Sequence, residues 1–163
     1  MNRPPFAATI IPSPLGPLFA EATQRGICRL SFDDPPKGAP ESAAGNPHLK
    51  KLRAELDRYF AGKLREFTVP VDPSGTPFRE RVWRELCGIP FGETISYAEM
   101  ARRIGNGKAS RAVGGANGAN TVCIVIPCHR VIAADGSLGG YSAGLRRKER
   151  LLALERDGVL PRE

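Results

Sequence analysis

The chain begins with short, mainly apolar runs. These runs contain β-branched and aromatic residues and are separated by turns with proline or glycine, which is the usual pattern of strands. We therefore predict strands at residues 6–11, 17–22 and 26–32. The segment after them, residues 33–47, is rich in proline, glycine and small residues and predicts a loop.

The next apolar pattern has the period of a helix. Its apolar face consists of Leu49, Leu52, Leu56, Tyr59 and Phe60. Gly62 ends the pattern, and residues 64–71 predict a return to a strand. Together these elements indicate a small α/β domain with antiparallel strands over residues 1–72, and its expected role is to support the rest of the chain.

A linker at residues 72–75 leads into a part of the chain that is dominated by helical patterns. Thr76 followed by Pro77 is typical of a helix start, with a cap residue and a proline at the first helical position. An apolar stripe that includes Trp83 follows, and Gly88 ends it. We interpret Trp83 as a core residue rather than as a surface on which bases stack.

Two short helices joined by a glycine-rich break come next. Ser96 and Glu99 have the spacing of a capping box, and a second helix begins near Ala109. The pair is a helix-turn-helix pattern, which alone is a weak indication of DNA binding because many protein cores contain such a pair. The predicted fold class is therefore α+β, with the small N-terminal α/β domain and a mostly helical, winged-helix-like domain over residues 76–163 that contains the helix-turn-helix.

The second of these helices contains several glycines, among them Gly114, Gly115 and Gly118. Each glycine costs roughly 1 kcal/mol of helix stability relative to alanine. A helix tolerates this cost where its backbone must approach another surface closely. With Arg111 near its start, the smooth face suits a narrow nucleic-acid groove, but tight packing against another helix explains the glycines equally well.

The apolar, β-rich run at residues 122–126 predicts a buried strand that ends in Pro127, Cys128 and His129. A free thiol has a pKa near 8.5, so a cysteine nucleophile needs a neighbouring base or cation to make the thiolate available. His129 can act on Cys128, directly or through a water, only if the chain turns between them, because neighbouring side chains on a strand point to opposite faces. The alternative is that Cys128 is a buried structural cysteine.

The other three cysteines, Cys28, Cys87 and Cys123, lie within apolar patterns, and we assign them to structural core positions. The sequence has no CxxC pair and no second pair of ligands at the spacing of a zinc site, so we expect neither a metal nor a cofactor. We expect no disulfides either, because a chain of this size with an intracellular character does not need them.

Charge is concentrated in the last third of the chain. Residues 101–163 carry 11 Lys and Arg against 5 Asp and Glu, and so hold most of the formal net charge of +7. This distribution fits a polyanion as partner, although a solvated basic surface is an equally good explanation. The sequence contains neither an apolar run long enough for a membrane span nor a secretory signal, so we expect a cytoplasmic protein without membrane contact.

Three segments of the second half resemble the O-6-alkylguanine-DNA alkyltransferases, also called methylated-DNA–protein-cysteine methyltransferases. They are RAVGGANGAN, IPCHRV and GGYSAGLRRKERLLALE. The resemblance is strong over about residues 76–155 and extends to the N-terminal domain in general layout. It implies direct-reversal DNA repair, in which the alkyl group of O-6-alkylguanine in double-stranded DNA passes irreversibly to the protein after the base is flipped, with one turnover per molecule.

The resemblance also implies the roles of the reacting residues. Cys128 matches the cysteine that accepts the alkyl group, and His129 the residue that takes the thiol proton through a water. Glu155 matches the carboxylate that orients this histidine, and Tyr97 the phenol that hydrogen-bonds guanine N-3 and protonates the departing base. This division of labour is the nucleophile, base and orienter logic of hydrolytic triads.

For DNA binding, Arg111 matches the arginine that fills the gap left by the flipped nucleotide. Ala112, Gly114 and Gly115 match the small residues that let the helix enter the minor groove, which suits repair because this groove carries little sequence information. We expect a monomer in solution, and cooperative binding along DNA stays open.

Four further residues match the hinge and the substrate pocket, namely Asn120, Val131, Tyr141 and Ser142. Asn120 corresponds to a hinge asparagine, and Tyr141 with Ser142 to an aromatic wall and a donor to guanine O-6. The backbone carbonyls of Val131 and of the acceptor cysteine are expected to accept the guanine amino group. Thr121 stands where a proline commonly follows the hinge asparagine, which should loosen that turn.

Two other functions remain as alternatives. A helix-turn-helix regulator without transfer chemistry would prefer one operator and would not need Cys128, but the second helix has few side chains that read bases. A thiol hydrolase that uses Cys128, His129 and Glu155 would need an oxyanion site, and it leaves the basic last third of the chain unexplained.

Overall fold

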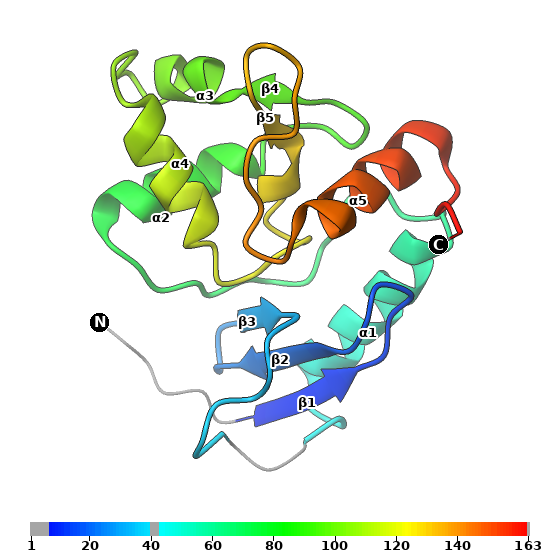
Figure 1. The fold of residues 1–163 in the computed structure, drawn as a ribbon. Coiled ribbons are helices and arrows are strands. Elements are labelled where there is room, and N and C mark those ends of the chain that lie inside the picture. Colours follow the sequence, from blue (N-terminus) through cyan, green and yellow to red (C-terminus); the bar gives the residue numbers. More distant parts are fainter. Residues whose placement is uncertain (1–6, 40–42, 163) are drawn as a thin grey trace.

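The computed structural model describes residues 7–39 and 43–162 of the chain (Figure 1). In chain order, its elements are β1 (Ala7–Ile11), β2 (Leu18–Ala22), β3 (Ile27–Ser31), α1 (Pro47–Phe60), α2 (Pro77–Leu86), β4 (Ile95–Ser96), α3 (Tyr97–Arg103), α4 (Ser110–Gly118), the 3₁₀ helix η1 (Cys128–Arg130), β5 (Val131–Ile132) and α5 (Leu145–Asp157). The predicted α+β class is confirmed. The first residue of the strand expected at 6–11, and residues 40–42 of the expected loop, lie outside the described residues.

Strands β1, β2 and β3 form an antiparallel meander that is covered by α1 (Figure 1). The pairing of β2 with β3 shifts register between Glu21 and Ala22, which marks a bulge. Leu49, Leu52 and Leu56 of α1 are buried, as their spacing predicts, and α1 contacts all three strands. Asn46 caps this helix by accepting hydrogen bonds from the first backbone N–H groups.

The strand predicted at residues 64–71 is wrong. Of this segment, only Val71 pairs with the sheet, through a single bridge to β3. The backbone N–H groups of Thr68 and Val69 instead donate to the buried carboxylate of Glu55 on α1, at 2.9 and 2.8 Å. A side chain therefore satisfies the backbone groups that a neighbouring strand would have paired.

The strand predicted at residues 122–126 is also wrong. Val122 alone bridges to β3, and the chain then folds into tight turns in which Ile124 has a left-handed φ of 70°. The Asn120 side chain closes these turns, because it accepts from the Val122 N–H at 3.0 Å and donates to the Ile126 carbonyl at 2.8 Å. An asparagine side chain has both an acceptor oxygen and a donor nitrogen, so it can bind a backbone N–H and a backbone carbonyl at once. These two backbone groups then need no partner on a neighbouring strand.

The caps predicted for two helices of the second half are confirmed. The Thr76 hydroxyl accepts from a backbone N–H of α2 at 3.2 Å, and Ser96 caps α3 by accepting from the Glu99 N–H at 3.0 Å. The Glu99 carboxylate pairs with Arg102 and Arg103 of its own helix. Helices α3 and α4 pack against each other as the expected helix-turn-helix, and β4 pairs with β5 in parallel.

Trp83 is a core residue, as predicted. Its side chain is buried, and its Nε1–H donates to the Ala116 carbonyl at 2.8 Å, which ties α2 to α4. Apolar residues from both parts of the chain join one continuous core, so the division into residues 1–72 and 76–163 stays a prediction. Over residues 7–39 and 43–162, none of the helices is long and apolar enough to cross a membrane.

The C-terminal ends of α1 and α5 meet at two glycines. Gly62 and Gly158 both have a φ of +74°, which favours glycine. A Cβ at Gly62 would run into the backbone oxygen of Gly158, whereas a Cβ at Gly158 would meet open space. The contact brings the first helix of the chain against the end of the last one.

We predict that Gly158→Ala costs about 1–2 kcal/mol of unfolding free energy, from its left-handed backbone alone. Gly62→Ala should cost clearly more, because no side-chain rotation can clear a backbone oxygen. Urea unfolding of the two variants measures the difference. Equal losses would show that the close approach of the two helix ends does not constrain the fold.

Candidate active site

The chain turns at Cys128, where it enters the 3₁₀ helix η1. Such a turn is what Cys128 and His129 need in order to act together, because an extended strand would separate their side chains. Cys128 is 2% exposed and His129 is 0% exposed. Both side chains therefore lie in a protein environment rather than in water.

His129 and Glu155 form a buried pair, with His129 Nε2 and Glu155 Oε2 at 2.7 Å. Arg130 adds two hydrogen bonds to the same carboxylate, from Nε to Oε1 at 2.7 Å and from Nη2 to Oε2 at 3.0 Å. Its third contact runs from Nη1 to the Ile89 carbonyl at 2.7 Å. The arginine thus fixes the carboxylate that holds the histidine.

The protonation of this pair follows from its surroundings. Burial tends to raise the pKa of Glu155, but hydrogen bonds from His129 and Arg130 and the positive charge of Arg130 outweigh burial and hold this pKa well below its usual range. An ionised carboxylate only accepts, so His129 Nε2 carries the hydrogen and Nδ1 presents its lone pair. Burial lowers the pKa of His129 despite the opposing effect of Glu155, so the imidazole is neutral.

The Cys128 thiol keeps its proton at neutral pH. Burial raises the pKa of Cys128, while the Asn120 amide and the charge of Lys148 act in the opposite direction. In the described part of the chain, the buried Nδ1 of His129 has no hydrogen-bond partner, and it is free to accept a proton. At neutral pH, the Cys128 thiol and the His129 imidazole are therefore both uncharged.

Tyr97 stands at the N-terminus of α3, against the loop at residues 137–144. Gly139 of that loop has a φ of +69°, and a Cβ there would lie 2.8 Å from the Tyr97 hydroxyl oxygen. Burial raises the pKa of Tyr97, and the nearby Cys128 adds to the effect, so the phenol stays protonated and can donate. Gly139 is therefore the residue that lets the loop approach the phenol.

The same loop carries the two predicted pocket residues. The Tyr141 hydroxyl is buried and has no hydrogen-bond partner among the described residues, whereas Ser142 is exposed. Lys148 of α5 is fully buried and donates to the carbonyls of Val131 at 2.7 Å, Gly140 at 3.0 Å and Leu138. One ammonium group thereby joins the loop to β5.

Two backbone carbonyls that we expected to accept a guanine amino group already have partners. The Cys128 carbonyl accepts from Asn117 Nδ2 of α4 at 3.0 Å and from the Val131 N–H. The Val131 carbonyl accepts from Lys148. A guanine amino group would therefore have to share or replace these hydrogen bonds.

Helix α4 has two different faces. Its inner face packs into the core and reaches Cys128 through Asn117. Its outer face exposes Arg111, Ala112 and Gly115. A Cβ added at Gly114, Gly115 or Gly118 would meet nothing within 4 Å, so packing inside the chain does not require these glycines. Of the two explanations for the glycines, the approach of an external surface is therefore favoured.

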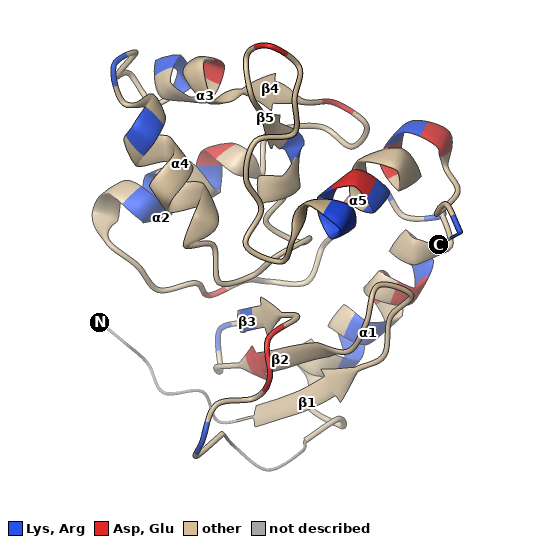
Figure 2. Cartoon of the chain, in the orientation of Figure 1, with Lys and Arg blue, Asp and Glu red and all other residues tan. Residues whose placement is uncertain are grey.

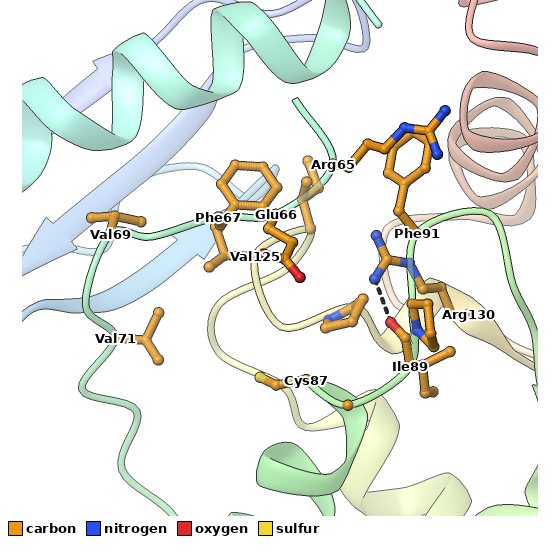
Figure 3. Close-up of a pocket in the computed structure, with 14 residues that line it drawn as sticks. Arg65, Glu66, Phe67, Val69, Val71, Cys87, Ile89, Phe91, Val125 and Arg130 are labelled. Atoms are coloured by element: carbon orange, nitrogen blue, oxygen red, sulfur yellow. Dashed lines mark hydrogen bonds between the residues drawn. The ribbon is translucent and has the colours of Figure 1, made fainter. Parts of the chain in front are cut away.

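A cavity of about 630 Å³ lies between residues 65–71, the loop at 87–91 and residues 124–127 (Figure 3). It adjoins the turn at Cys128–Arg130, which we call the reactive turn. Arg130 lines it, and the figure shows its hydrogen bond to Ile89. Cys128 does not line this cavity. The hollow therefore gives no access to the thiol.

The remaining cysteines only partly match the prediction that they occupy core positions. Cys123 is buried and Cys28 is half-buried, but Cys87 is exposed, and all are free thiols. Cys87 directly follows Leu86, the last residue of α2, and does not share the buried position of Leu86. Among the described residues, no three His, Cys, Asp or Glu side chains come together as a metal site would require.

Most of the chain matches known proteins. Family models match residues 7–73 as the ribonuclease-like domain and residues 77–157 as the DNA binding domain of 6-O-methylguanine DNA methyltransferase. A methylated-DNA–protein-cysteine methyltransferase of Methanosarcina acetivorans is 45% identical over 149 residues, which are 90% of this chain and 96% of that protein. The chain belongs to this methyltransferase family.

Two other members of the methyltransferase family extend the likeness. The protein of Mycobacterium leprae is 44% identical over 91% of either chain. The crystal structure of Mycobacterium tuberculosis OGT in complex with DNA is 42% identical, with a TM-score of 0.88 and 94% of both chains covered. The fold predicted from the sequence is therefore the fold of known methyltransferase structures.

Several residues around this candidate site were not predicted from the sequence. Tyr59 was expected only in the core, yet its hydroxyl donates to Glu155 at 2.6 Å. Lys148 was not expected at all. The sequence does contain one indication of its role, because Lys148 lies three residues before Leu151 on the buried stripe of α5. A lysine in such a position needs hydrogen-bond acceptors within the protein. Asn117 likewise gave no sign of its bond to the reactive turn.

We predict that Lys148→Met lowers the unfolding free energy by about 3 kcal/mol, because it leaves carbonyls without their donor. Lys51→Met on the exposed side of α1 is the matched control and should change stability little. Urea unfolding measures both, and hydrogen exchange should show faster opening at residues 138–140. Equal stability of the two variants would contradict the role of Lys148 in holding the loop.

Proposed function

We propose that this chain repairs DNA by direct reversal, moving the alkyl group of O-6-alkylguanine onto Cys128. The observation that carries this proposal is a buried 3₁₀ turn in which Cys128 is followed directly by His129, whose ring is held by Glu155, in a chain closely related to methylated-DNA–protein-cysteine methyltransferases. The likeness to an OGT structure in complex with DNA supports DNA as the partner. The roles given below to individual residues are part of the same proposal.

The transfer starts from the neutral pair. The Cys128 proton passes to Nδ1 of His129, directly or through a water, and Glu155 stabilises the imidazolium that forms. The thiolate attacks the alkyl carbon, a carbon–sulfur bond forms and the bond between this carbon and guanine O-6 breaks. The electron pair of that bond leaves with the guanine.

Tyr97 completes the exchange of protons. Guanine is a poor leaving group as an anion, and a phenol that stays protonated can donate to guanine N-3 as negative charge develops. The proton that leaves Tyr97 is replaced, in the overall balance, by the one that His129 took from Cys128. The thioether that results is stable, and we expect each molecule to act once.

Helix α4 provides the DNA contact in this proposal. Lys and Arg lie on α2, α3, α4 and the turn between α3 and α4, among acidic residues on α2 and α3, and further Lys and Arg lie on α1 and α5 (Figure 2). The smooth outer face with Ala112, Gly114 and Gly115 fits the minor groove, and Arg111 takes the place of the flipped base. Asn117 connects this helix to the acceptor cysteine, so that binding and chemistry share one element.

The pocket for the flipped base is assigned to Asn120, Val131, Tyr141 and Ser142. With Cys128 only 2% exposed, a purine reaches the sulfur only after the groups that cover it move. The proposal further includes residues 1–72 as a supporting domain and residues 76–163 as the domain for DNA binding and transfer. It also includes a monomer in solution and a cytoplasmic location.

Incubation with a methylated oligonucleotide should increase the mass of the intact protein by one methylene, mapped to Cys128. The yield should level off at one methyl group per molecule. Cys128→Ala should abolish transfer and keep lesion binding. Cys87→Ala is the matched control, because Cys87 is exposed and would be the first target of unspecific alkylation. Repeated turnover, or label on Cys87, would contradict the proposal.

Arg111→Ala should weaken both binding and transfer on duplex DNA, while reaction with the free O-6-alkylguanine base should suffer less. The exposed Arg53 of α1 gives the control variant Arg53→Ala, which should behave like the unchanged protein. Transfer rates on both substrates test this, together with binding at several salt concentrations, because phosphate contacts weaken as salt rises. An equal loss on both substrates would exclude the role of Arg111 in base flipping.

A further inference from the structure

The Oε2 atom of Glu155 is shared by three donors. Besides His129 at 2.7 Å and Arg130 at 3.0 Å, the Tyr59 hydroxyl donates to it at 2.6 Å. Hydrogen bonds to an ionised carboxylate are short and strong. Each hydrogen bond to Oε2 therefore weakens the attraction that this oxygen exerts on the other two donors.

Tyr59 reaches this oxygen from α1, which belongs to the part of the chain expected only to give support. Its ring is 0% exposed and packs against Phe60, Phe67 and Phe91, with centroids 5.3, 5.3 and 6.2 Å away. The hydroxyl therefore has a fixed position. Burial and the adjacent Glu155 raise the pKa of Tyr59 well above its usual value, so it remains a donor at any pH at which the protein works.

We propose that Tyr59 is a positioning residue for alkyl transfer: its hydroxyl fixes the Glu155 carboxylate and limits the pull of that carboxylate on a proton at His129. This inference rests on the proposed function, in which His129 must be neutral to take the Cys128 proton. Without the hydroxyl, Oε2 would stabilise a positive charge on the imidazole more strongly. His129 would then be protonated at a higher pH. The N-terminal part of the chain thereby takes part in setting the reactivity of the thiol.

The other groups that face His129 fit this balance. Burial disfavours its charged form most strongly, and the positive charges of Arg130 on η1 and Lys148 on α5 act in the same direction. Glu155 on α5 is the group that favours the charged form. Tyr59 on α1 weakens that single opposing influence without adding a charge.

The test is Tyr59→Phe, which removes one oxygen atom and keeps the ring contacts. Single-turnover transfer to a methylated duplex is measured against pH, where the acid limb reports the protonation of His129. We expect this limb to move up by about half a pH unit, so that transfer on the limb slows about threefold, with little change on the plateau. Titration of the His129 ring by NMR should show the same upward shift without any reaction.

Phe67→Leu is the matched control, because it removes a ring contact of Tyr59 and leaves the hydroxyl in place. It should lower stability and leave the acid limb where it is. A fluorotyrosine at position 59 keeps the shape of the side chain and donates more strongly, so it should move the limb downward.

An acid limb that stays unchanged in Tyr59→Phe and with fluorotyrosine would overturn the inference, and so would a uniform loss of rate at every pH. A chain that transfers no methyl group in its unchanged form would instead refute the proposed function. The NMR titration would still decide whether Tyr59 acts on His129.

Discussion

The Glu155 carboxylate is almost completely buried and yet ionised, so its charge has to be met by donors from within the protein. Those donors are His129 and Arg130 of η1, Tyr59 of α1 and the backbone N–H of Gly92. They come from segments far apart in the sequence, and each is held where the carboxylate needs it. The charge on α5 therefore fixes the relative positions of the first helix, the loop after α2 and the reactive turn.

This arrangement keeps the Cys128 thiol and the His129 imidazole, which we propose to be the reacting groups, neutral at rest. Burial disfavours the charged forms of both Cys128 and His129, so the thiol and the imidazole hold no charge at rest. A thiol in that state reacts slowly with chance electrophiles, in contrast to a thiolate exposed to water. We expect this protein to be consumed by one reaction. A thiol that does not react with other electrophiles beforehand is therefore an advantage.

The sequence predicts those features that depend on neighbouring residues. The helix caps at Thr76 and Ser96 follow from local residue types, and so does the buried face of α1. The two strands that were wrongly predicted failed for a common reason. In both segments a polar side chain outside the apolar run, Glu55 on α1 or Asn120 just before residue 122, takes over backbone hydrogen bonds that the apolar pattern attributes to a sheet.

The site shows the same limit. The pairing of His129 with Glu155 could be expected from the family resemblance, and the structure brings the two together. The contacts of Tyr59 and Lys148 join residues many positions apart, and no spacing rule points to them. Only the fold reveals that a tyrosine in an apolar stripe carries its hydroxyl to a buried charge.

The empty space above the α4 glycines has a consequence for how this helix can change over time. Alanine at Gly114, Gly115 or Gly118 would encounter no atom of the chain and would strengthen the helix by roughly 1 kcal/mol at each position. Folding alone thus gives a lineage no reason to keep glycine here. Any selection that preserves these three positions has to come from something outside the protein, so their variation would record the demands of a partner rather than of the fold.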